Sequence, residues 1–138
     1  MPYRITWEPD GVYRTYFGVV TDSERRESLA EICGDRRFDD LRYAITDFLE
    51  IADFIESAQA TLELAAFNIA PLVTNSRLIL AAVAIDPRHI EYVERIRGLG
   101  LIKAPYECFP TVAEARRWIA ENAGIPVQTQ SSPVRDDA

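Results

Sequence analysis

The sequence predicts an α/β domain with a five-stranded mixed sheet and four helices, in the order β-β-α-β-α-β-α-β-α. Short β-prone segments alternate with segments whose apolar residues recur at helical spacing, which is typical of strand-helix-strand units. Successive units of this kind place strands two to five parallel, with right-handed crossovers. The turn Pro9-Asp10-Gly11 makes strand one antiparallel to strand two, because proline fixes φ and glycine accepts positive φ.

The strand segments are rich in β-branched and aromatic residues and are bounded by turn or capping residues. We expect them at residues 3–7, 12–20, 43–49, 77–85 and 106–109. The fourth is almost continuously apolar, which is typical of a strand in the middle of a parallel sheet.

The first two helices are bounded by recognisable start and stop residues. Thr21 and Glu24 have the spacing of a capping box, so helix one is expected to begin there and to end at Gly34. Helix two is expected to begin near Asp53 and to end or kink just before Pro71, because the residue before a proline disfavours helical geometry.

The last two helices have equally clear boundaries. Asp86 can cap helix three with Pro87 as its first residue, and Gly98 ends it. Thr111 opens helix four with a second capping box, and Gly124 ends it.

Helix four is predicted to bury Ala115, Trp118 and Ile119 on its one apolar face. Residues 1–122 are therefore interpreted as a single domain. Residues 123–138 contain prolines and polar residues without periodicity, and they are interpreted as a disordered tail.

The composition argues against several functional classes. The net charge is −7, from 15 basic and 22 acidic residues, so nucleic acid is not expected as a partner. No apolar run is long enough to insert into a membrane, and no signal pattern stands at the N-terminus. Cys33 and Cys108 are too few for a disulfide framework. We therefore expect a cytoplasmic protein with reduced thiols.

The sequence carries no motif of a common cofactor, metal or catalytic centre. A phosphate loop, a Gly-x-Gly-x-x-Gly fingerprint and a Gly-x-Ser-x-Gly elbow are all absent, so no cofactor is expected. His89, the one histidine, is expected to face solvent on helix three. Asp47 lies in an apolar strand and is expected to be hydrogen-bonded structurally.

A candidate site lies where strand three passes into helix two. Ligands of open parallel sheets bind outside the carboxyl ends of the strands. We expect a partner or ligand edge there, and its candidate residues are Glu50, Asp53, Phe54, Glu56 and Ser57. The stretch 48–55 is very apolar for a connection, so it either packs inward or presents an apolar patch to a partner.

Several stretches together resemble one family. They are Gly18–Thr21, Arg42–Phe48, Thr74–Arg77, Tyr106–Phe109 and Ala115–Ile119. With the order of elements over about residues 3–120, they resemble the STAS-type, SpoIIAA-like fold of anti-sigma-factor antagonists and sulfate-transporter tails. The resemblance is greatest to uncharacterised bacterial stand-alone STAS-like proteins.

The resemblance implies a non-enzymatic module that binds another protein or regulates it. Phosphorylatable STAS antagonists carry Asp-Ser-Ser-Gly at the start of helix two, whereas this chain has Glu56-Ser57-Ala58-Gln59. Because Ala58 replaces the serine that takes phosphate, the resemblance implies that the kinase-controlled switch is missing. Two other functions stay open: a domain that binds a small apolar molecule or lipid between sheet and helices, and an enzyme of unrecognised type.

Overall fold

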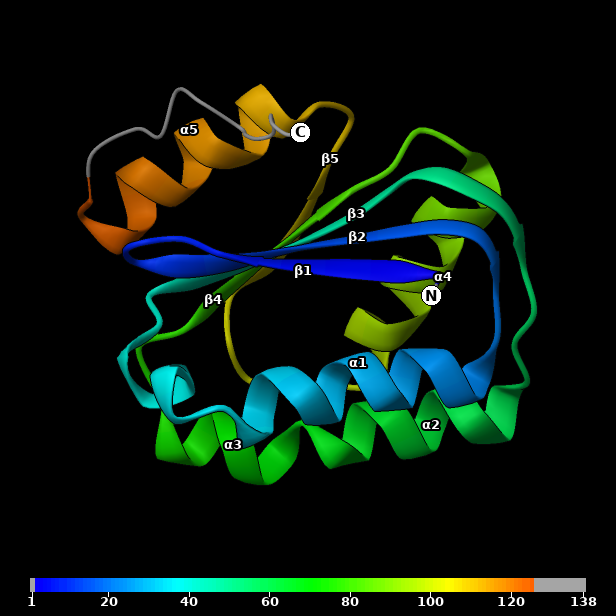
Figure 1. Cartoon of the computed structure of the whole chain (residues 1–138), viewed down its shortest axis with the longest axis horizontal. Coiled ribbons are helices and arrows are strands. Elements are labelled where there is room, and N and C mark those ends of the chain that lie inside the picture. Colours follow the sequence, from blue (N-terminus) through cyan, green and yellow to red (C-terminus); the bar gives the residue numbers. More distant parts are fainter. Residues whose placement is uncertain (1, 126–138) are drawn as a thin grey trace.

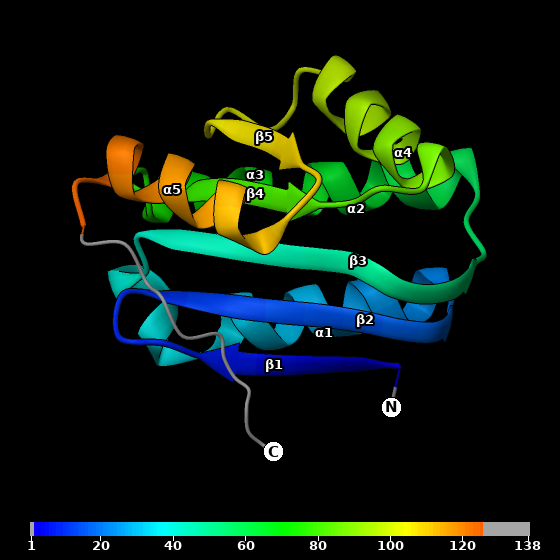
Figure 2. The same cartoon turned by 90° about the horizontal axis from the view of Figure 1, so that it is seen from above.

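The five predicted strands form one sheet. The computed structural model describes residues 2–125. The strands lie in sequential order in space and are β1 (Tyr3–Trp7), β2 (Gly11–Val20), β3 (Tyr43–Phe54), β4 (Ile79–Val83) and β5 (Tyr106–Phe109). The first pair is antiparallel and all other pairs are parallel, which confirms the predicted topology (Figures 1 and 2).

The helices match the predicted number once helix two is seen to be broken. The described helices are α1 (Asp22–Gly34), a short 3-10 helix η1 (Arg36–Asp40), α2 (Ala58–Phe67), α3 (Ile69–Thr74), α4 (Pro87–Gly98) and α5 (Val112–Ala123). Helix two of the prediction corresponds to α2 and α3 together. The capping box of α1 and the Asp86 cap of α4 are present as predicted.

The boundary between β3 and α2 was predicted wrongly. Strand β3 continues to Phe54, because its residues stay paired with β2 despite two shifts in the register of the two strands. Beyond this point, the Val20 carbonyl accepts a hydrogen bond from the Ile55 amide at 2.9 Å. Helix α2 therefore begins after Ser57 and not near Asp53.

The end of the predicted helix two also differs. The chain breaks at Asn68, and Pro71 lies inside the first turn of α3, where its missing amide hydrogen leaves no helical bond unmade. Strand β4 is shorter than the predicted 77–85.

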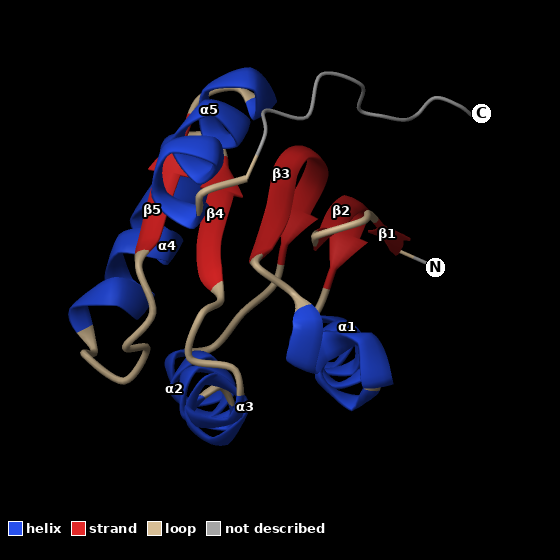
Figure 3. Cartoon of the chain, turned by 90° about the vertical axis from the view of Figure 1, so that its left-hand side faces the viewer, coloured by secondary structure: helices blue, strands red, loops and turns tan. Residues whose placement is uncertain are grey.

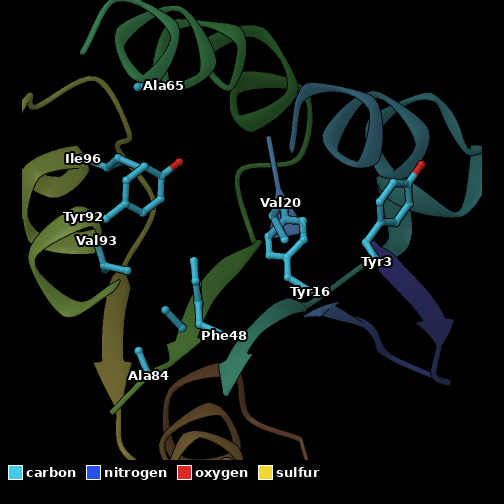
Figure 4. Packing of buried hydrophobic residues seen from close by; sticks show 10 residues of the cluster. Tyr3, Tyr16, Val20, Phe48, Ala65, Ala84, Tyr92, Val93 and Ile96 are labelled. Atoms are coloured by element: carbon cyan, nitrogen blue, oxygen red, sulfur yellow. The ribbon is translucent and has the colours of Figure 1, made fainter. Parts of the chain in front are cut away.

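The helices lie on both faces of the sheet, but unequally. Helices α1 to α4 cover one face (Figure 3). Phe48, Ala65 of α2, and Tyr92 and Val93 of α4 belong to one buried cluster there (Figure 4). On the opposite face, Ile119 of α5 and its neighbours pack on β3 and β4. Helix α5 packs mainly on β3, β4 and β5, and its Arg116 side chain reaches over the Tyr13 ring of β2. None of the described helices lies over β1 on this face (Figure 2).

A buried polar network fixes α5 to the β1–β2 turn. Arg116 donates from both terminal nitrogens to the Glu8 carboxylate, at 3.0 and 2.8 Å. The Tyr43 hydroxyl also donates to Glu8. Burial, and after it the hydrogen bond to Glu8, raises the pKa of Tyr43 above its ordinary value. The network thus joins residues 108 positions apart in the sequence.

Some predictions concern the ends of the described region. The expected tail begins at residue 123, but Ala123 is buried as the last residue of α5. Residues 126–138 of that predicted tail lie outside the described residues. Trp118 is only half-buried and packs on Phe109, with ring centroids 5.5 Å apart. Among the described helices, none is long and apolar enough to span a membrane.

Candidate functional site

The predicted partner edge lies at the carboxyl end of β3, beside the end of β2. Glu50 pairs in register with Phe17, and Asp53 pairs with Val19. Both carboxylates are exposed, and within residues 2–125 Asp53 accepts a hydrogen bond only from the following amide of Phe54, at 2.9 Å. These two side chains are therefore free to meet a partner.

Phe54 differs from its neighbours because its ring points into the core. The ring packs edge-on against Tyr92 with centroids 4.7 Å apart, and it also contacts Phe48 and His89. The Arg25 guanidinium lies over it at 4.5 Å. Phe54 thus anchors the end of β3 and is not part of an exposed patch.

Glu56 links the β3–α2 connection to α4. Its carboxylate accepts from Arg95 at 3.0 Å and from the Thr61 hydroxyl. Partial burial raises the pKa of the Glu56 carboxyl, but the hydrogen bonds from Thr61 and Arg95 outweigh this effect and bring the pKa below its ordinary value. Glu56 is therefore ionised and already engaged within the protein.

Ser57 is the N-cap of α2 and remains exposed. Its hydroxyl oxygen accepts from the Ala60 amide at 3.1 Å, and the hydroxyl contacts Asp22 of α1 at 3.4 Å. A phosphate on Ser57 would gain from the helix N-terminus but would meet the carboxylate of Asp22.

Exposed apolar side chains surround these polar ones. Val19 and Ile55 are each 52% exposed, Ile85 is 63% exposed, and Leu49 is also exposed. Val19, Ile55 and Ile85 lie at or just beyond the carboxyl ends of β2, β3 and β4, and Leu49 lies in β3 just beyond its last residue paired with β4. We call Val19, Leu49, Glu50, Asp53, Ile55 and Ser57 the β3 edge surface. Within residues 48–55, the exposed Leu49 and Ile55 support the interpretation as an apolar patch, whereas Phe48 and Phe54 pack inward.

Asp47 behaves as the sequence predicts. It is buried and accepts from the Tyr13 hydroxyl at 2.5 Å and from the Leu49 amide at 2.8 Å. Burial, followed by the hydrogen bond to Asp47, raises the pKa of Tyr13 above its ordinary value.

The prediction for His89 was wrong. The residue is 2% exposed, and its ring packs on Phe48 and Phe54. Burial lowers its pKa, while the nearby Asp86 opposes the shift and Arg88 adds to it. Because His89 and Asp47 lie on opposite faces of β3, they do not form one catalytic cleft.

Two features escaped the sequence analysis. Arg14 and Arg25 line a cavity between the sheet and the helices, although arginine seldom lies inside a domain. In addition, α2 and α3 expose Leu62, Phe67, Ile69 and Val73. The second feature had a signal in the sequence, because Glu63 is the only charged residue from 58 to 74.

The comparisons with known proteins bear on the fold. No protein-family model and no curated protein matches the sequence significantly. Among solved structures, the anti-sigma factor antagonist SpoIIAA in its unphosphorylated form aligns with a TM-score of 0.58 and 12% identity, over 85% of this chain and 96% of that chain. The Bacillus cell fate determinant SpoIIAA in the phosphorylated form gives 0.56 and 17%, over 85% and 98%.

A third structure belongs to an uncharacterized protein of the DUF3478 family from Shewanella loihica PV-4, described as having a SpoIIAA-like fold. It aligns with a TM-score of 0.52 and 12% identity, over 85% of this chain and 91% of that chain. These values and the matching sheet topology give the same result as the resemblance in the sequence. The chain has the STAS-type, SpoIIAA-like α/β fold.

Proposed function

We propose that this chain is a non-enzymatic module that binds another protein through the β3 edge surface and so acts as a regulator. The observation that carries the proposal is the set of exposed apolar side chains at the carboxyl ends of the strands, where Val19 and Ile55 are half exposed beside the free carboxylates of Glu50 and Asp53. An apolar centre with a polar rim is the composition of a protein interface. The fold supports the proposal, since SpoIIAA is an anti-sigma factor antagonist.

Binding at this surface is proposed to be independent of phosphorylation. In the resemblance of the sequence to the family, Ala58 stands where the phosphorylated serine is expected, and Ser57 caps α2. The Asp22 carboxylate, which the Ser57 hydroxyl contacts at 3.4 Å, opposes a phosphate there.

The proposal is tested by comparing two matched substitutions in an affinity purification from the native host. Ile55→Asp places a charge in the β3 edge surface, whereas Val73→Asp places the same charge on exposed α3. Quantitative mass spectrometry should find partners that are lost with Ile55→Asp and retained with Val73→Asp. Retention of every captured protein by Ile55→Asp would contradict the proposed surface, and loss with Val73→Asp alone would move the interface to α2–α3.

A second function, binding of a small molecule between sheet and helices, is favoured by the cavity that contains Arg14 and Arg25. This cavity lies on the side of the sheet that α1 to α4 cover. Its lining residues do not include Glu50, Asp53, Ile55, Glu56 or Ser57. The two functions therefore use different parts of the molecule.

A further inference from the structure

A cavity of about 90 Å³ lies between the sheet and helices α1 to α4. Most of its wall is apolar, including Leu29 and Ile32 of α1 and Leu64 of α2. Tyr92 also lines it, and Figure 4 shows the hydroxyl of Tyr92 directed from α4 toward the interior. Apart from its charged residues, the cavity resembles an ordinary gap in an apolar core.

Arg14 of β2 brings a positive charge to this wall without an acidic partner. Its terminal nitrogens donate to the hydroxyls of Ser28 at 3.0 Å and Thr46 at 2.8 Å. Its Nε is buried and has no hydrogen-bond partner among the described residues. Within residues 2–125, no carboxylate lies within 4.0 Å of Arg14.

Arg25, the other arginine of the cavity, provides the contrast. Arg25 is buried, whereas Arg14 is half-buried, and the Nε of both lacks a hydrogen-bond partner among the described residues. The Arg25 guanidinium, however, pairs with Asp22 and donates to the Ile55 carbonyl at 3.2 Å. An arginine inside a protein is normally neutralised in this way, because an unpaired charge in a poorly solvated site is costly. The uncompensated positive charge of the cavity is therefore the Arg14 guanidinium.

The chemistry of this guanidinium defines the ligand that would complete it. Two neutral hydroxyls satisfy part of its donors but leave the charge and the Nε hydrogen unmatched. A carboxylate fits best, because a guanidinium offers parallel donors with the spacing of two carboxylate oxygens. The apolar wall then favours an aliphatic tail. The tail must be short, since this cavity is smaller than the engineered cavity of about 150 Å³ that binds benzene.

We propose that the cavity binds a short aliphatic monocarboxylate, with its carboxylate on Arg14 and its tail against Leu29, Ile32 and Leu64. This inference rests on the second function proposed above, small-molecule binding in this cavity, and does not depend on the binding of a protein partner. Leu29 and Leu64 come from α1 and α2, whose exposed ion pair Arg26–Glu63 joins the two helices outside the cavity. A slight separation of these helices would open a path for the ligand.

The test is thermal unfolding of the full chain in a series of sodium acetate, propionate, butyrate and octanoate, with sodium chloride at equal ionic strength as the reference. Affinity should rise by about fourfold for each added methylene up to butyrate, and it should be lower for octanoate, which exceeds the cavity. Butyramide, which lacks the charge, should bind at least tenfold more weakly than butyrate. Equal effects of chloride and butyrate, or of butyramide and butyrate, would overturn the proposal.

Two variants and one spectrum assign the effect to Arg14. Arg14→Met should weaken butyrate binding at least tenfold, while Arg4→Met, at an exposed arginine of β1, should bind as the wild type does. Undiminished binding by Arg14→Met would refute the site. If Arg14→Met does not fold, the Nε–H resonance of Arg14 in the wild-type protein decides: butyrate should shift it in a saturable way and leave that of Arg4 unchanged, and an unshifted Arg14 resonance would refute the site.

Discussion

Replacing Arg116 with methionine should destabilise the domain strongly while keeping the volume of the side chain. The Arg116 side chain is 5% exposed and that of its partner Glu8 is 13% exposed. The substitution removes both charge-assisted hydrogen bonds and leaves the Glu8 carboxylate with only the Tyr43 hydroxyl. Removal of one member of a buried ion pair costs about 3–5 kcal/mol, because the other charge stays buried.

Urea unfolding followed by circular dichroism measures this cost. The neighbouring exposed residue supplies the control, and Arg117→Met should change the free energy of unfolding by less than about 0.5 kcal/mol. The double variant Glu8→Gln with Arg116→Met should be more stable than the sum of the single effects predicts, because the uncompensated carboxylate is gone. A cost below about 1 kcal/mol for Arg116→Met, or simple additivity, would refute the role assigned to the network in fixing α5.

Three further predictions concern buried or capping side chains. Burial lowers the pKa of His89 below its ordinary 6.5, so near this pH the folded state binds fewer protons than the unfolded state. The wild type should therefore lose stability as the pH falls below about 6.5. His89→Leu should abolish this loss when urea unfolding is compared at pH 7.5 and 5.5. Trp118→Ala should cost about 2 kcal/mol in the same assay, less than the 3–5 kcal/mol of a fully buried aromatic residue, because Trp118 is half-buried. Glu56→Lys should disrupt partner capture more than Ser57→Ala, and intact-mass spectrometry of the native protein should find no stoichiometric phosphate on Ser57; either a phosphate there or the reverse order of effects would restore a phosphorylation switch.

The sequence predicted the topology because local signals for it were strong. The caps at Thr21, Asp86 and Thr111 each specify the start of a helix with their own side chains, and the structure contains all three. The turn at Pro9–Gly11 is also present, although Gly11 does not adopt a positive φ. The end of β3 was different. Asp53 and Glu56 have the spacing of a capping box, but ladder bonds to β2 hold this segment extended, and such long-range pairing leaves no local signal.

The buried polar residues divide into those that the sequence could have revealed and those that it could not. His89 precedes Val93 by four residues and Ile96 by seven, so helical spacing alone places it on the buried face of α4. Arg14 alternates with Val12 and Tyr16 in β2, but Tyr13 and Phe17 make the opposite face equally apolar. The burial of its Nε follows from which face of the sheet α1 to α4 cover, and only the assembled fold determines this.

The two proposed sites are separated by the sheet and its connections, and each has its own chemistry. The β3 edge surface offers apolar side chains and free carboxylates to a macromolecule. The interior cavity offers one uncompensated guanidinium to a small anion. Arg25 lies between them, because it lines the cavity and also donates to the carbonyl of Ile55 in the β3 edge surface.

The central proposal, that a protein partner binds the β3 edge surface, is tested most directly by amide hydrogen exchange of the captured complex. The free chain and the complex are compared peptide by peptide. We predict that the partner slows exchange in residues 49–57, and that it leaves exchange in residues 62–74 of α2 and α3 unchanged. Slowed exchange confined to residues 62–74, or no change in 49–57, would contradict the account.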